Sequence, residues 1–80
     1  MDRKNEVRDL SFEFALRIIT QAEQMLDHRK YVLGNQLLKS GTSIGANVRE
    51  AQQAESRQDF IHKMKIALKE ADETEYWLLL

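Results

Sequence analysis

The sequence contains no proline and no cysteine, and its three glycines all lie between positions 34 and 45. Because proline and glycine are the strongest interrupters of helices, their scarcity favours long, unbroken helices. The absence of cysteine excludes disulfide bonds and thiolate metal sites, and it is compatible with a reducing cytoplasm. A chain of 80 residues buries only about 60–65% of its unfolded surface, so its own core is marginal.

Long hydrophobic runs and an excess of one charge are also missing. No apolar segment approaches the roughly 20 residues of a membrane-spanning helix, and residues 1–6 lack the apolar part of a secretory signal. We therefore expect a cytoplasmic protein that makes no contact with a membrane. The formal net charge is −1, so any binding to nucleic acid has to come from a local basic surface.

Two helical stripes of different chemistry run side by side through residues 33–51. The apolar stripe recurs at steps of three and four and comprises Leu33, Leu37, Gly41, Ile44, Val48 and Ala51. The second stripe lies one position earlier and comprises Gln36, Ser40, Ser43, Asn47 and Glu50. Because this second stripe is mostly small and neutral, we predict a helix that is buried on most of its sides.

The periodicity predicts three helices, at about residues 9–27, 31–54 and 57–80, in a single bundle domain that spans residues 1–80. Ser56, followed three residues later by Asp59, resembles a capping box and marks the start of the third helix. The apolar face of the first helix comprises Leu10, Phe14, Ala15, Ile18, Ile19, Ala22, Met25 and Leu26. The core stripe of the third comprises Phe60, Met64, Ala67, Ala71, Thr74 and Leu78.

The last turns of the third helix lack the usual stop signals. Acidic residues from Glu70 to Glu75 lie where the helix dipole favours cations, and no glycine or asparagine cap follows. The end is apolar around most of its circumference through Tyr76, Trp77 and Leu78. We expect these side chains to be covered by a fourth helix lost by truncation or by a neighbouring subunit.

Two segments of the chain resemble a known family. Residues 36–51 read QLLKSGTSIGANVREA, and residues 66–78 read IALKEADETEYWL. Together with Asp59, Phe60 and Ile61 between them, they resemble the bacterial four-helix bundle family, also called the 23S rRNA intervening sequence protein or S23 family. Either segment alone is a weak signal, but the two together are specific and cover nearly the whole chain.

The resemblance implies an all-α, antiparallel up-and-down bundle in which this chain supplies three of four helices. It also implies assembly into a homopentamer, a ring with a central channel. A related member, the accessory variability protein of diversity-generating retroelements, partners a reverse transcriptase and binds nucleic acid through a basic surface. RNA, DNA and a protein such as a reverse transcriptase are therefore the implied partners. No enzymatic activity is associated with the family, so the implied function is a non-enzymatic scaffold or adaptor.

The polar stripe admits two interpretations. Its members form a functional network, or they satisfy one another and the next helix inside the bundle. Because each buried polar group without a partner costs about 1–3 kcal/mol, the structural interpretation is sufficient and we favour it. The glycines Gly41 and Gly45 lack the preceding strand and the following Lys of a phosphate-binding loop.

A metal-dependent bundle enzyme is an alternative from a different class. Asp59 and His62 have the spacing by which a carboxylate and an imidazole share one helix face in di-iron bundles, and Glu50 and Glu70 are the further candidates. A second acidic residue three positions before a histidine is absent, because His28 has none. We therefore expect no metal, no cofactor and no catalytic residue.

Basic residues scattered over two predicted helices are the candidates for contact with RNA or DNA: Lys39, Arg49, Arg57, His62, Lys65 and Lys69. Five copies around a ring would multiply a modest patch, because phosphate binding grows with each neutralised charge. The acidic residues of the third helix oppose this if they share the same surface. A third possibility is a helical interaction module that a partner protein completes at Trp77 and Leu78.

Overall fold

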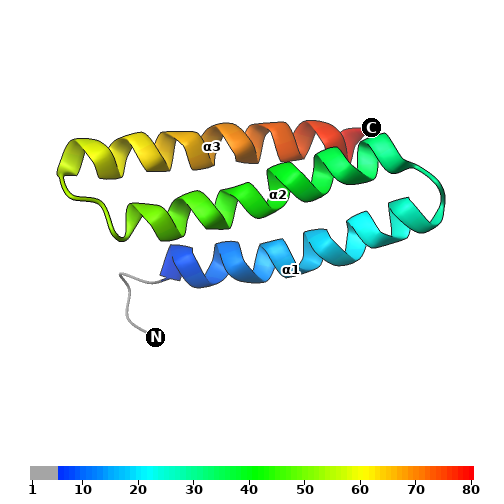
Figure 1. Cartoon of the computed structure of the whole chain (residues 1–80), viewed down its shortest axis with the longest axis horizontal. Coiled ribbons are helices and arrows are strands. Elements are labelled where there is room, and N and C mark those ends of the chain that lie inside the picture. The colour runs from blue at the N-terminus through cyan, green and yellow to red at the C-terminus, as the bar shows by residue number, and fades with distance from the viewer. Residues whose placement is uncertain (1–5) are drawn as a thin grey trace.

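The computed structural model describes residues 6–80, which form three helices and no strand. Helix α1 spans Glu6–Asp27, α2 spans Tyr31–Ala51 and α3 spans Arg57–Leu79. Successive helices run antiparallel through short connections (Figure 1). The predicted all-α class is confirmed. No helix in this part of the chain is both long and apolar enough to cross a membrane.

The helix bounds differ from the expected ones at two ends. Helix α1 begins at Glu6 instead of near residue 9, with Glu6 and Asp9 in its first turn, where the helix dipole favours acids. Helix α2 ends at Ala51 instead of near residue 54. The amides of Gln53 and Ala54 donate to carbonyls three residues earlier, at 3.0 and 3.1 Å, so the helix tightens into a turn before it stops.

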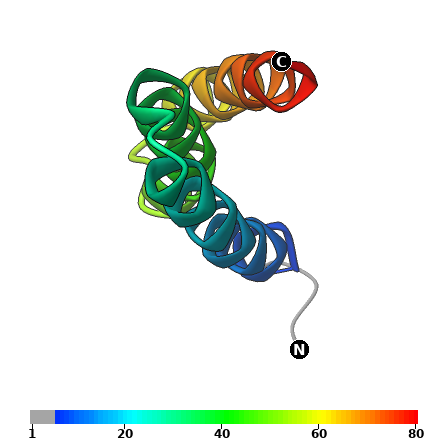
Figure 2. The same cartoon turned by 90° about the vertical axis from the view of Figure 1, so that its right-hand side faces the viewer.

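Helix α2 lies in the middle of the arrangement. It packs against both α1 and α3, whereas no Cα atom of α1 lies within 8 Å of a Cα atom of α3. Seen along the long axis, the three helices form an open curve with α2 at its centre (Figure 2). The predicted burial of α2 therefore comes from two neighbours on different sides, and the inner side of the curve stays open.

The core is small and lies where α2 meets α1. Ile18 and Ala22 of α1 pack with Leu37 of α2, and Trp77 of α3 packs against this cluster from the other side. Gly41 allows the close approach, because a Cβ atom at this position would lie 2.5 Å from the Cγ2 atom of Ile18. The glycine thus sets the distance between the two helices.

Two helix ends are closed by hydrogen bonds that explain the local sequence. At the end of α1 the amides of Arg29 and Lys30 donate to the carbonyls of Leu26 and Met25, at 3.0 and 2.8 Å. This is a Schellman motif, and it places Arg29 at φ 62°, a conformation that normally favours glycine. At the start of α3 the amide of Asp59 donates to Ser56 Oγ at 3.0 Å, so Ser56 caps this helix as the sequence predicts.

Much of the expected core of the outer helices is not covered. Helix α1 buries Ser11, Ile18 and Ala22, while Leu10 keeps 57% of its surface exposed. Helix α3 buries only Ala67 and Thr74. Leu10, Phe14, Phe60 and Leu78, all predicted core residues, are exposed because nothing in residues 6–80 fills the open side of the curve.

Candidate functional site

An extensive apolar groove of about 570 Å³ lies between α1 and α3, with α2 as its floor. We call it the α1–α3 groove. Glu75 is the only charged residue that lines it. The lining residues are Val7, Leu10, Ser11, Phe14, Ile44, Val48, Ala71, Thr74, Glu75 and Leu78. A contiguous apolar surface of this kind marks a place where another element packs.

The three residues expected to be covered at the end of α3 point in different directions. Leu78 lines the α1–α3 groove. Trp77 is half-buried against the core and donates from Nε1 to a carboxylate oxygen of Glu73 at 3.3 Å. Tyr76 is exposed and meets Trp77 edge-on, with ring centroids 5.1 Å apart. Of the three, the groove therefore includes only Leu78.

The polar stripe of α2 is satisfied mostly by its own helix. Ser40 and Ser43 donate from their hydroxyl groups to the carbonyls of Leu37 and Lys39, at 3.4 and 2.7 Å. Asn47 donates to the carbonyl of Ser43 at 2.8 Å. Gln36 is half-buried on the same side of the helix.

Glu50 is the member of the polar stripe with a recorded bond to another helix. Its carboxylate lies 3.3 Å from the ammonium group of Lys63 on α3. None of the recorded hydrogen bonds joins two side chains of the stripe. Within residues 6–80, every buried side-chain nitrogen and oxygen has a hydrogen-bond partner.

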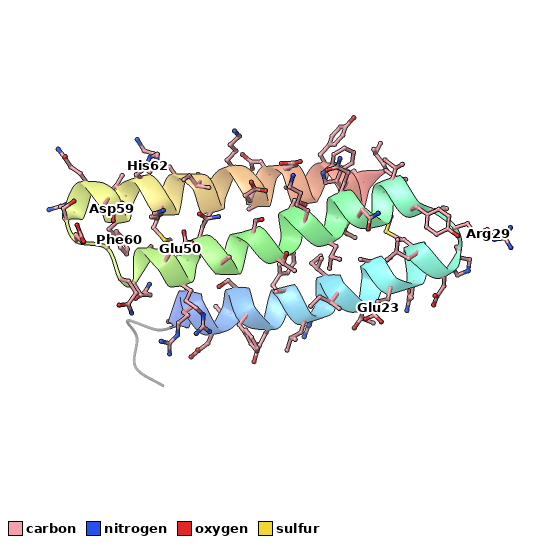
Figure 3. The ribbon with its side chains drawn as sticks, viewed as in Figure 1. Glu23, Arg29, Glu50, Asp59, Phe60 and His62 are labelled. Atoms are coloured by element: carbon pink, nitrogen blue, oxygen red, sulfur yellow. The ribbon has the colours of Figure 1, made fainter. Side chains whose placement is uncertain are left out.

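The acidic residues and the histidine of the metal-enzyme alternative do not come together. Figure 3 shows His62 projecting from α3 away from α2, whereas Glu50 is engaged by Lys63 between the two helices. No group of three or more His, Cys, Asp or Glu residues in residues 6–80 could hold a metal ion. The geometry therefore gives this alternative no support.

The six basic candidates are all exposed, but they fall on different surfaces. His62, Lys65 and Lys69 share one outward face of α3, because they are three and four residues apart. Asp72 follows on the same face and weakens its positive field. Arg49 instead lies beside α1, and the structure does not bring it together with the basic face of α3.

A second hollow, of about 330 Å³, lies between α1 and α2. We call it the Arg8–Arg49 hollow. Its lining residues are Arg8, Phe12, Ala15, Thr42, Gly45, Ala46 and Arg49. Sequence reasoning did not identify Arg8 or Phe12. The available signal was the pair Phe12 and Leu16, which lies outside the main apolar face of α1 and is about half exposed.

Two comparisons with known proteins found a match. A family model described as 23S rRNA-intervening sequence protein matches residues 3–80. A crystal structure of a protein of unknown function from the S23 ribosomal protein family of Bacteroides thetaiotaomicron VPI-5482 is similar, with 59% sequence identity and a TM-score of 0.87. The similarity covers 90% of this chain and 68% of that one. No curated protein matches the chain.

Proposed function

Because the chain belongs to the 23S rRNA-intervening sequence protein family, we propose that it acts as a non-enzymatic helical scaffold whose α1–α3 groove binds one further helix. The observation that carries this proposal is the open arrangement of the three helices. Helix α2 packs against both neighbours while the backbones of α1 and α3 stay more than 8 Å apart, which leaves large apolar side chains uncovered. A fourth helix in this position would complete the bundle.

The groove defines what its occupant should look like. Leu10, Phe14 and Leu78 are each more than a third exposed along it, so the occupant needs apolar residues at helical spacing. A basic residue opposite Glu75 would pair with the only charge in the lining. Because these three side chains are already about half covered, completing their burial contributes about half of the roughly 1.5–3 kcal/mol of each fully buried side chain, or about 3 kcal/mol in total.

The similar Bacteroides protein offers a source for the occupant. About a third of that chain lies outside the similarity. Adding that part to this chain, in the position it has in the Bacteroides protein, tests the proposal. Unfolding in urea should show a higher midpoint and a steeper slope, because more surface is buried. An added segment that is helical but leaves both quantities unchanged would contradict the proposal.

A matched pair of variants assigns the gain to the groove. Leu10→Gln changes a groove residue, whereas Val32→Gln changes an exposed apolar residue outside it. In the extended protein, Leu10→Gln should remove much of the added stability and Val32→Gln little of it. Equal losses would show that the added segment packs elsewhere. If the groove is instead completed by a different protein, adding the Bacteroides segment should not raise the stability of this chain.

Self-association into a ring, a pentamer by family resemblance, is the second part of the proposal. It is supported by Phe12 and Leu16, which are about half exposed on α1 outside the groove. Sedimentation equilibrium over a range of concentrations measures the assembly. A protein that stays monomeric at micromolar concentration would remove this part and leave the groove proposal standing.

Contact with RNA or DNA is the third part, and it is supported by the outward face of α3 formed by His62, Lys65 and Lys69. Fluorescence anisotropy with a structured RNA and a DNA duplex should show binding that weakens as salt rises, because phosphate contacts release counterions. Lys65→Glu should weaken binding. Lys30→Glu, the same charge change in the α1–α2 turn, should weaken it less. Undetectable binding at low salt would end this part.

By the same family resemblance, a reverse transcriptase is a protein partner to test.

A further inference from the structure

The Arg8–Arg49 hollow places two positive charges from different helices at one site. Arg8 is paired with its neighbour Asp9, but the pair is long, at 3.7 Å, and both side chains are about a third exposed. Such a pair contributes little in water. No ion pair is recorded for Arg49 among residues 6–80. Two guanidinium groups that line one hollow repel each other unless an anion lies between them.

The hollow also has an apolar part and a free acceptor. Phe12 is 52% exposed at its side, and Ala15, Gly45 and Ala46 give it small walls. Its volume is about 330 Å³, which is room for an aromatic side chain. The Thr42 hydroxyl donates to the Leu38 carbonyl at 2.7 Å and keeps its lone pairs for another donor. The best ligand is therefore an aromatic ring with a hydroxyl group beside a carboxylate.

The outer face of α3 carries that combination. Tyr76 is 56% exposed, and Asp72 is exposed one turn before it on the same face. Asp72 is the acidic residue nearest Tyr76 on this face, and Lys69 lies one turn before Asp72. Glu75 instead lines the α1–α3 groove. This face points away from α2 and from the α1–α3 groove, since Thr74 is buried and Leu78 lines that groove. A fourth helix in the groove leaves Asp72 and Tyr76 exposed.

We propose that the Arg8–Arg49 hollow of one copy binds the outer face of α3 of a second copy, with Tyr76 in the hollow and Asp72 beside the arginines. The inference rests on the proposed self-association and names its two surfaces. An aromatic anchor in a pocket next to paired charges is the usual arrangement of a strong contact. Because the two surfaces differ, each copy binds one neighbour through its hollow and another through its α3 face. Such head-to-tail contacts form a ring when the rotation from copy to copy adds up to a full turn.

Charge exchange tests the pairing through the concentration at which the protein assembles. Arg49→Glu and Asp72→Arg should each raise that concentration by at least about tenfold. The double variant restores opposite charges and should return within about threefold of the original. Lys39→Glu is the matched control, because it makes the same charge change on an exposed part of α2 outside the hollow. Equal effects of Lys39→Glu and Arg49→Glu would overturn the proposal.

Single cysteines test the orientation, since the natural chain has none. Ala46→Cys lies in the hollow, and Lys69→Cys lies on the α3 face one turn from Asp72. Under oxidation, a mixture of the two variants should form a mixed disulfide, whereas each variant alone should not. A disulfide between two Ala46→Cys chains, or between two Lys69→Cys chains, would show a two-fold contact and overturn the proposal.

The results separate this inference from the proposed function. If the unmodified protein stays monomeric, the proposed assembly fails and this interface fails with it. If it assembles, but Arg49→Glu assembles equally well and no mixed disulfide forms, only the interface assigned to the hollow fails. Circular dichroism of every variant checks that its helices are intact.

Discussion

Gly41 faces Ile18 at the contact between α2 and α1, and its replacement by alanine should destabilise the protein. A Cβ atom at this position would lie 2.5 Å from Cγ2 and 2.9 Å from Cγ1 of Ile18. Carbon atoms in normal contact are about 3.5–4.0 Å apart. Ile18 is only 3% exposed, so its side chain has little space in which to turn away. The two helices therefore have to separate.

The expected size follows from two opposing effects. In the interior of a helix, alanine in place of glycine gains up to about 1 kcal/mol. Overpacking of a close contact costs about 1–3 kcal/mol. We expect the free energy of unfolding to fall by about 1 kcal/mol in Gly41→Ala, measured in urea by circular dichroism.

A double-mutant cycle decides whether Ile18 is the cause. Ile18→Ala removes the two nearest atoms that a Cβ at position 41 would meet and leaves the Cβ atom of residue 18 at 3.0 Å. In that background Gly41→Ala should lie between neutral and a gain of about 1 kcal/mol, because the helix preference is opposed only by the one remaining contact. Ile18→Ala itself costs about 2–5 kcal/mol, so the cycle is measured with a stabilising osmolyte present. A gain of the same size from Gly41→Ala in both backgrounds would refute the packing described between α1 and α2.

Two further predictions concern the helix ends. Arg29→Gly should raise the free energy of unfolding by about 0.5–1 kcal/mol, because glycine adopts the left-handed conformation without strain. Arg29→Ala keeps the strain and should change little, so an equal gain from both substitutions would point to charge instead of backbone. Ser56→Ala should lower the free energy of unfolding by about 1 kcal/mol, because the amide of Asp59 loses its acceptor. Ser56→Asn should recover most of that loss in the same urea titration, and a neutral Ser56→Ala would contradict the cap.

The helices and the central place of α2 follow from short-range rules. Leu37 and Val48 are fully buried, as the three-and-four spacing predicts, and Gly41 marks the close contact with α1. Ser56 predicts the start of α3 because a cap depends only on residues three positions apart. Helix α2 ends at Ala51, about three residues before the predicted end, because no glycine or proline signals the tightening turn that follows.

The uncovered surfaces could not be predicted from the pattern. Leu10 and Phe14 have the spacing of core residues, but spacing does not say whether an element is present to cover them. The same limit applies to Ser43 and Asn47, whose side chains bond to their own helix backbone instead of to each other. The Arg8–Arg49 hollow depends on which helices are neighbours, and the sequence of α1 alone does not contain that information.

The central claim is that the α1–α3 groove is the docking face for one more helix. The most direct test is the rate at which a single cysteine at Leu10 reacts with a thiol reagent, before and after the remaining part of the Bacteroides protein is added. We predict rapid reaction in the 80-residue chain and a rate at least about tenfold lower in the extended protein, since a covered thiol reacts only when the added helix opens. Glu23→Cys, on an exposed part of α1 that points away from α2 (Figure 3), should react equally fast in both. An unchanged rate at position 10, with the added segment folded as a helix, would contradict the account.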